Sequence, residues 1–154
     1  MLTIYKASAG SGKTYTLAYE YVRMLLGVKL DDGAYRLNAA RYIGGNVKSS
    51  RHRNILAITF TNKATEEMKS RIVDELSSLA ADHSDGSKDC PYAKGLIKEY
   101  GCTREELREV AEKALRSLLF DYHHFNVSTI DSFFQTVLRA FAREVDRQGD
   151  YGIE

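Results

Sequence analysis

Residues 7–14 combine the residue types that hold a nucleoside triphosphate. They read Ala-Ser-Ala-Gly-Ser-Gly-Lys-Thr and depart from the phosphate-loop pattern G-x-x-x-x-G-K-[ST] only at the first position. Glycines allow backbone N–H groups to converge on phosphate oxygens, and the helix that follows adds the positive end of its dipole. The loop therefore predicts a nucleotide site formed by Ala9, Gly10, Ser11, Gly12, Lys13 and Thr14.

Two side chains of this loop are expected to act on the triphosphate itself. Lys13 is long enough to reach the outer phosphates, and Thr14 offers a hydroxyl to Mg²⁺. The expected cofactors are therefore ATP and Mg²⁺. An ordinary glycine-rich turn before a helix is the simpler interpretation, but it explains neither the lysine nor the hydroxyl residue beside it.

Hydrolysis needs a further carboxylate that helps to hold Mg²⁺, and the sequence does not clearly supply it. Residues 71–75 look like an apolar strand ending in Asp-Glu, but Ile72 continues the four-residue rhythm of the preceding helix. Asp74 and Glu75 are therefore predicted on a solvated helix face. Asp131 follows a strand without an acidic neighbour. The isolated chain is expected to bind ATP without turning it over.

A strand before the loop and a helix after it are needed to position the site, and the sequence predicts both. Leu2–Lys6 reads as a short strand, and a helix with one apolar face is expected from about Gly12 to a stop at Gly27. Asn54–Phe60 is a nearly continuous apolar run, typical of a central parallel strand covered on both faces. Phe125–Thr129 is a third predicted strand.

Further helices follow from apolar residues that recur every three or four positions. One is expected around Met68, and a short one ends near Tyr100. Thr103 and Glu106 form a capping box at the start of a long helix. The last helix begins at about Ser132 and is expected to bury one face, formed by Phe134, Leu138, Phe141 and Val145.

The order of these elements predicts an α/β fold with a parallel sheet and right-handed crossovers. Residues 28–53 show no clear period and are interpreted as a surface insertion.

Composition limits the classes of protein that fit. The chain has 154 residues, of which 44% are hydrophobic and 28% charged, as expected for one folded domain. No apolar stretch could cross a bilayer, and no signal peptide is recognisable. Cys90 and Cys102 form no C-x-x-C pair, so a reducing cytoplasm is expected. His123 and His124 have no cysteine or carboxylate at ligand spacing, which argues against a metal site.

The distribution of charge suggests a nucleic-acid partner in one segment only. The net charge of +1 gives no reason to expect a polyanionic partner. Residues 48–71, however, hold six basic and two acidic side chains, an excess that could follow a DNA backbone or simply form a solvated face.

Three ordered segments resemble motifs I, Ia and Ib of the UvrD-like superfamily 1 DNA helicases. They are the loop at 7–14, the run Ile-Thr-Phe-Thr-Asn-Lys-Ala at 58–64 with Glu67-Met68 and Arg71-Ile72, and the run Ser-Thr-Ile-Asp-Ser-Phe at 128–133. The form of the loop and the aspartate of the third segment are similar to the RecB/AddA-like helicase–nuclease branch.

The resemblance implies that residues 1–154 form the N-terminal portion of a RecA-like ATP-binding helicase domain. Its P-loop NTPase sheet with flanking helices would be incomplete because the chain is truncated: in family members the Asp-Glu motif, the arginine finger and a second RecA-like domain lie further along. The implied activity is ATP-driven movement along single-stranded DNA, with 3′-to-5′ unwinding of double-stranded DNA. The implied partners include another subunit of a helicase–nuclease complex, and an exonuclease domain would lie elsewhere.

The resemblance also assigns roles to single residues. Tyr15 stands where many members have an arginine that stacks on adenine, so it is placed to stack on the base or simply to pack. Asp131 stands where many members have histidine, and it is expected to orient the local backbone. The residues implied to face DNA are Phe60, Thr61, Asn62, Lys63, Thr129, Ser132 and Phe133.

A small P-loop kinase or other phosphotransferase is the alternative function. It accounts for the length of the chain but not for the segment at 59–64. A nucleotide-gated interaction module without turnover is a third possibility.

Overall fold

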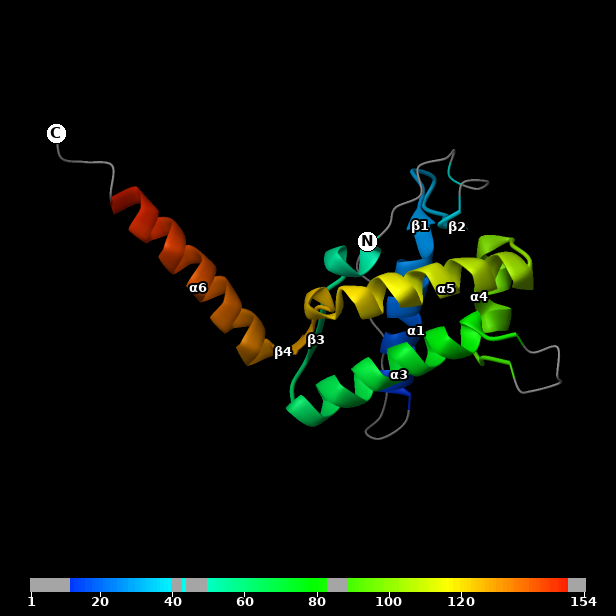
Figure 1. Ribbon diagram of the computed structural model, residues 1–154, viewed down its shortest axis with the longest axis horizontal. Helices are drawn as coiled ribbons and strands as arrows, with labels where there is room; N and C mark the ends of the chain where they lie inside the picture. Colours follow the sequence, from blue (N-terminus) through cyan, green and yellow to red (C-terminus); the bar gives the residue numbers. More distant parts are fainter. Residues whose placement is uncertain (1–11, 40–42, 44–49, 83–88, 150–154) are drawn as a thin grey trace.

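The computed structural model describes residues 12–39, 43, 50–82 and 89–149, with side chains up to Glu144. The predicted strand Leu2–Lys6 and most of the phosphate loop lie outside the described residues. Figure 1 shows a body of packed helices with a hairpin at one end and a last helix that projects away from it.

The helix predicted after the loop is confirmed. Helix α1 spans Lys13–Leu26 and buries one apolar face in the core. It ends at Gly27, where an added Cβ would lie 2.7 Å from Cε1 of Tyr100. A larger residue there would displace a buried tyrosine, so Gly27 is required by close packing.

Helices α3 (Asn62–Ala80), α4 (Ala93–Tyr100) and α5 (Arg104–Phe120) are also as predicted. The capping box of α5 is present, since the Thr103 side chain accepts from Glu106 N and Glu106 accepts from Thr103 N. Helices α3 and α5 run side by side with α1 packed across them (Figure 1). This three-helix contact holds most of the core.

A small parallel sheet is confirmed, with strands shorter than predicted. Strand β3 (Ala57–Thr59) pairs in parallel with β4 (Val127–Thr129), and Thr59 lies opposite Thr129. Two residues without regular structure precede each strand, 55–56 and 125–126. The 3₁₀ turns η1 (Arg51–Asn54) and η2 (Tyr122–His124) come before them. The described residues therefore form a mixed α/β fold.

The prediction that Asn54–Phe60 is covered on both faces is wrong for the described part of the chain. The side chains of Leu56 and Ile58 are 48% and 42% exposed. Among the described residues β3 has β4 as its only strand neighbour.

Residues 27–37 contain two strands that the sequence pattern did not predict. Strands β1 (Gly27–Lys29) and β2 (Tyr35–Leu37) form an antiparallel hairpin. Its turn is held by a hydrogen bond of 2.8 Å from Ala34 N to Asp32 Oδ1. Leu37 and His52 are buried, so the 28–53 segment also contributes side chains to the interior.

The last helix, α6 (Ile130–Gly149), begins two residues earlier than predicted. Its predicted buried face is wrong, because Phe134, Leu138 and Phe141 are 56%, 65% and 66% exposed. Beyond its start the helix extends away from the body, and no described element packs along that face (Figure 1). Val145 lies beyond the described side chains.

The expectations about membrane-spanning segments and cysteines concern the described helices and the two cysteine side chains. No helix among them has both the length and the apolarity needed to cross a membrane. Cys90 and Cys102 are buried and unpaired. Burial raises the pKa of Cys90 to about 12 and that of Cys102 to about 11, so both remain thiols at neutral pH.

Candidate functional site

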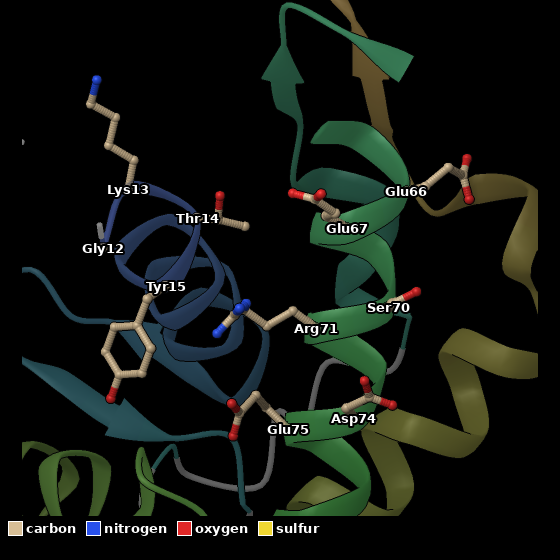
Figure 2. Close-up of a pocket in the computed structure, with 10 residues that line it drawn as sticks. All are labelled: Gly12, Lys13, Thr14, Tyr15, Glu66, Glu67, Ser70, Arg71, Asp74 and Glu75. Carbon is tan, nitrogen blue, oxygen red and sulfur yellow. The ribbon is translucent and has the colours of Figure 1, made fainter. Parts of the chain in front are cut away.

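A pocket of about 980 Å³ lies between the start of α1 and one side of α3 (Figure 2). One wall comes from the end of the predicted phosphate loop, and the other from a polar stripe on α3. The lining residues are Gly12, Lys13, Thr14, Tyr15, Glu66, Glu67, Ser70, Arg71, Asp74 and Glu75.

The loop side of the pocket has the local geometry of a helix start. Gly12 has a φ of 96°, a left-handed conformation that L side chains rarely adopt. Its carbonyl accepts from Thr16 N at 2.8 Å, which begins the helix immediately after it. Lys13 is exposed and Thr14 half-buried, at the end where the first free N–H groups of α1 lie. Ala9, Gly10 and Ser11 lie outside the described residues.

The α3 side supplies residues that the sequence analysis missed. Arg71 faces the pocket together with four carboxylates, which lie at positions 66, 67, 74 and 75. The residues at 67, 71 and 75 recur every four positions, one place before the buried stripe of Met68, Ile72 and Leu76. That spacing was visible in the sequence, but only the contact with α1 turns this polar stripe into a pocket wall.

The predicted helical state of Asp74 and Glu75 is confirmed, but the surroundings of Glu75 differ from the prediction. Asp74 is exposed, whereas Glu75 is half-buried. Glu75 Oε2 accepts a hydrogen bond of 3.1 Å from Cys90 Sγ. A contact between side chains fifteen positions apart removes Glu75 from a fully solvated face.

Tyr15 packs against Tyr92 on one side and remains partly exposed at the pocket on the other. Its ring meets the ring of Tyr92 edge-on, with centroids 4.9 Å apart. The hydroxyl of Tyr92 also donates to Tyr15 O at 3.1 Å. Burial, and then the charge of Glu75, raise the pKa of Tyr15. About 40% of Tyr15 remains exposed at the pocket.

The two segments resembling DNA-facing motifs lie side by side at the carboxyl ends of β3 and β4. Thr59 and Thr129 are partners in the parallel register, so both chains leave the sheet at the same edge. Phe60 is 87% exposed there, although it ends an apolar run. Asn62 and Lys63 are also exposed. Open α/β sheets bind ligands at this edge.

Both segments begin a helix, and their threonines serve as caps. Thr61 Oγ1 accepts from Ala64 N at 3.1 Å at the start of α3. Thr129 Oγ1 accepts from Ser132 N at 3.2 Å at the start of α6. Two positive helix ends therefore point to one sheet edge, which favours an anion.

The remaining residues of the second segment lie in the first turn of α6. Ser132 is exposed and Phe133 half-buried, with its ring 5.9 Å from that of Phe134. Asp131 is exposed in the same turn, where a carboxylate stabilises the positive end of the helix dipole. This gives a local physical reason for an acidic residue at that position.

Asp121 fixes the beginnings of both strands. Its carboxylate accepts from His52 Nε2 at 3.0 Å and from His124 Nδ1 at 2.7 Å, and it pairs with Arg53. Arg53 precedes β3 and His124 precedes β4, while Asn126 Nδ2 donates to Arg53 O at 3.1 Å. Hydrogen bonds from Arg53 and His124 hold the pKa of Asp121 well below its usual range.

The expectation that no carboxylate lies near His123 and His124 is wrong. The turn of η2 brings Asp121 within 4.8 Å of ligand atoms of both histidines. Arg53 also pairs with that carboxylate.

We expect Asp121→Asn to destabilise the fold in a pH-dependent way. A carboxyl whose pKa is lowered by folding stabilises the native state above its unfolded pKa, about 3.9, and loses that contribution as the pH falls toward the folded value. The melting temperature of the variant should therefore lie below wild type at pH 7, and the gap should narrow below about pH 4. Thermal unfolding followed by circular dichroism measures it. Asp74→Asn is the exposed control, and a gap independent of pH would contradict the assignment.

Comparison with known proteins decides the family. A model of the UvrD/REP helicase N-terminal domain matches residues 2–154. The chain belongs to the UvrD/REP helicase family. The matched region includes the predicted phosphate loop and both sheet-edge segments, and the resemblance drawn from the motifs is confirmed.

Similar curated proteins belong to the helicase–nuclease branch of the UvrD/REP family. The RecBCD enzyme subunit RecB of Escherichia coli (strain K12) is 31% identical over 144 residues, covering 90% of this chain and 10% of that protein. RecB of Buchnera aphidicola subsp. Acyrthosiphon pisum is 28% identical over 138 residues, which cover 90% of this chain and 10% of that protein. An ATP-dependent helicase/nuclease subunit of Lactobacillus johnsonii is 29% identical over 147 residues, which cover 96% of this chain and 8% of that protein. The chain therefore spans about a tenth of the length of these relatives, and they give the kinase alternative no support.

Proposed function

We propose that the chain is the ATP-binding part of an ATP-dependent DNA helicase or helicase–exonuclease that moves along single-stranded DNA. The observation that carries this is the placement of α3. Its first turn, with Asn62 and Lys63, lies at the sheet edge next to the second motif, and its next turns line the pocket beside Thr14. One rigid element therefore contacts both proposed ligands.

The nucleotide half of the proposal assigns ATP to the pocket in a P-loop, RecA-like manner. Ala9–Thr14 bind the phosphates, with Lys13 on the outer phosphates and Thr14 on Mg²⁺. The left-handed Gly12 and the free N–H groups at the start of α1 support this. Arg71, which faces the same pocket, adds a second positive charge. Tyr15 is placed to stack on the base.

The DNA half assigns the shared sheet edge to single-stranded DNA. Phe60 offers an exposed ring to a base, and Lys63 offers its charge to a phosphate. Thr61 and Thr129 cap their helices, so they contribute through the helix ends rather than through free hydroxyls. The residues proposed at this edge are Phe60, Thr61, Asn62, Lys63, Thr129, Ser132 and Phe133.

Side chains of α3 also link the two ligands. Lys63 Nζ lies 4.0 Å from Glu67 Oε1, and Glu67 lines the pocket. A DNA phosphate would attract Lys63, and Mg²⁺ of a bound nucleotide would attract Glu67. Either ligand would therefore weaken this long ion pair. The relatives are named as enzyme subunits, which supports a further assignment: the whole protein works beside a partner subunit of a helicase–nuclease complex. Double-stranded DNA is the assigned substrate for unwinding.

Paired substitutions at the sheet edge test this function. Lys63→Ala should weaken binding of an oligo-dT strand and lower the slope of log K against log salt by about 0.7, because one phosphate contact is lost. Phe60→Ala should cost about 1–3 kcal/mol with little change in slope, because stacking releases few counterions. Fluorescence anisotropy over a salt series measures both.

Lys94→Ala is the control for that series, since Lys94 is exposed on α4, away from the sheet edge. Equal affinity and equal slope for all four proteins would exclude this edge as the DNA site.

A further inference from the structure

The two ends of the pocket offer different groups to a ligand. At one end lie Lys13 and the start of α1, where free N–H groups and the helix dipole favour phosphate. At the other end, along α3, Glu75 lies near Tyr15, with the guanidinium of Arg71 beside them (Figure 2). Tyr15 exposes an aromatic ring there, so the nucleoside is the part of a nucleotide that fits this end.

Glu75 is held at that end by a buried donor. Cys90 is 3% exposed, and its thiol donates to Glu75 Oε2 at 3.1 Å. Burial keeps the pKa of Cys90 high, so the donor hydrogen is present at neutral pH. No hydrogen bond from a described residue uses the other oxygen, Oε1. One carboxylate oxygen is fixed and the second is available to a ligand.

The same short segment also orients Tyr15. Tyr92, two residues after Cys90, donates its hydroxyl to Tyr15 O at 3.1 Å and sets its ring edge-on against the Tyr15 ring. Residues 90–92 thus place an aromatic ring and a carboxylate oxygen together at this end of the pocket. A ring with an adjacent hydrogen-bond acceptor is what recognises a nucleoside rather than its phosphates.

We propose that Glu75 is a specificity-determining residue that accepts a hydrogen bond from an N–H or O–H group of the bound nucleoside, with Cys90 as its positioning residue. The inference rests on the proposed nucleotide function and adds a nucleoside contact to it. The available donors are the exocyclic amino group of adenine and the ribose hydroxyls, which share this chemistry because a carboxylate only accepts.

Calorimetry with Mg²⁺ and four ligands tests the inference: ATP, inosine triphosphate, 2′,3′-dideoxy-ATP and inorganic tripolyphosphate. Glu75→Ala should weaken ATP binding about tenfold, because a hydrogen bond to a charged group is lost. Binding of tripolyphosphate, which has no nucleoside, should be unchanged or tighter. Glu75→Gln should restore part of the ATP affinity, because its amide oxygen still accepts. Cys90→Ala should weaken ATP binding less than Glu75→Ala does, and it should leave the binding of tripolyphosphate unchanged.

The analogues locate the donor. If wild type prefers ATP to inosine triphosphate and Glu75→Ala does not, the donor is the adenine amino group. If wild type prefers ATP to 2′,3′-dideoxy-ATP and Glu75→Ala does not, the donor is a ribose hydroxyl. Glu109→Ala, which removes an exposed carboxylate of α5 outside the pocket lining, should keep ATP affinity within about twofold.

Two results would overturn the inference: unchanged ATP affinity in Glu75→Ala, or equal losses for ATP and tripolyphosphate. Matching melting temperatures show that the variants are folded. Failure of the underlying function looks different, because wild type would then bind neither ligand, or Lys13→Ala would bind tripolyphosphate as well as wild type.

Discussion

Replacing Lys13 by alanine is expected to weaken ATP binding by roughly a hundredfold. The ammonium group is the proposed charged partner of the outer phosphates, and Lys13 is the first residue of α1, where the free N–H groups of the helix lie. Isothermal titration calorimetry with Mg²⁺-ATP measures the loss. Adenosine, which lacks phosphates, should bind wild type and variant alike.

Lys29→Ala is the matched control, because Lys29 is an exposed lysine on β1, away from the pocket. It removes the same charge from the chain and should leave the ATP affinity within about twofold. Equal losses in both variants would mean that net charge, not a phosphate contact, governs binding.

The second large effect is expected from Ile72→Ala. Ile72 is fully buried in the middle of α3, where the helix packs on α1 and α5. Truncation leaves a cavity and should lower the free energy of unfolding by about 3 kcal/mol. Urea unfolding followed by circular dichroism gives the value. The slope of that free energy with urea should stay constant if only stability changes.

Ser70→Ala is the control on the same helix, since Ser70 is exposed. It should change the free energy of unfolding by less than about 0.5 kcal/mol. Alanine favours the helix more than serine or isoleucine does, so helix propensity cannot cause a loss in either variant. A comparable loss in both variants would contradict the claim that burial of Ile72 stabilises the packing of α3 on α1.

The elements that could be predicted are those specified by local interactions. Helix α5 begins at its capping box because Thr103 and Glu106 satisfy each other's backbone groups without any distant partner. Helix α3 follows from the apolar repeat of Met68, Ile72 and Leu76, which also excluded a strand at Asp74 and Glu75. The adjacency of the two segments proposed to face DNA follows from the parallel pairing of β3 and β4 alone.

The elements that could not be predicted depend on distant partners. The hairpin of β1 and β2 has strands of three residues, too short for a period to be recognised. The apolar face of α6 predicts burial against a partner, but the sequence pattern does not identify that partner. Among the described residues Phe134 and Leu138 remain exposed. Phe60 looks like core by the same pattern and is exposed because it lies past the end of the strand.

The candidate site shows the same division. The loop motif identified Gly12, Lys13 and Thr14 from sequence, since glycines and a helix start are local features. The opposite wall was missed, because Arg71 and Glu75 reach the pocket through the packing of α3 on α1. The bond from Cys90 to Glu75 spans a loop that no periodicity encodes.

The central claim is that one helix, α3, contacts both the nucleotide and the DNA, and the coupling of the two ligands tests it most directly. The Kd of a labelled oligo-dT strand should be measured by anisotropy with and without a non-hydrolysable ATP analogue and Mg²⁺. The account predicts a change in Kd of about fivefold or more in wild type, the same factor for the analogue when DNA is titrated first, and no change in Lys13→Ala. An oligo-dT Kd that stays constant in wild type while the analogue is demonstrably bound would contradict it.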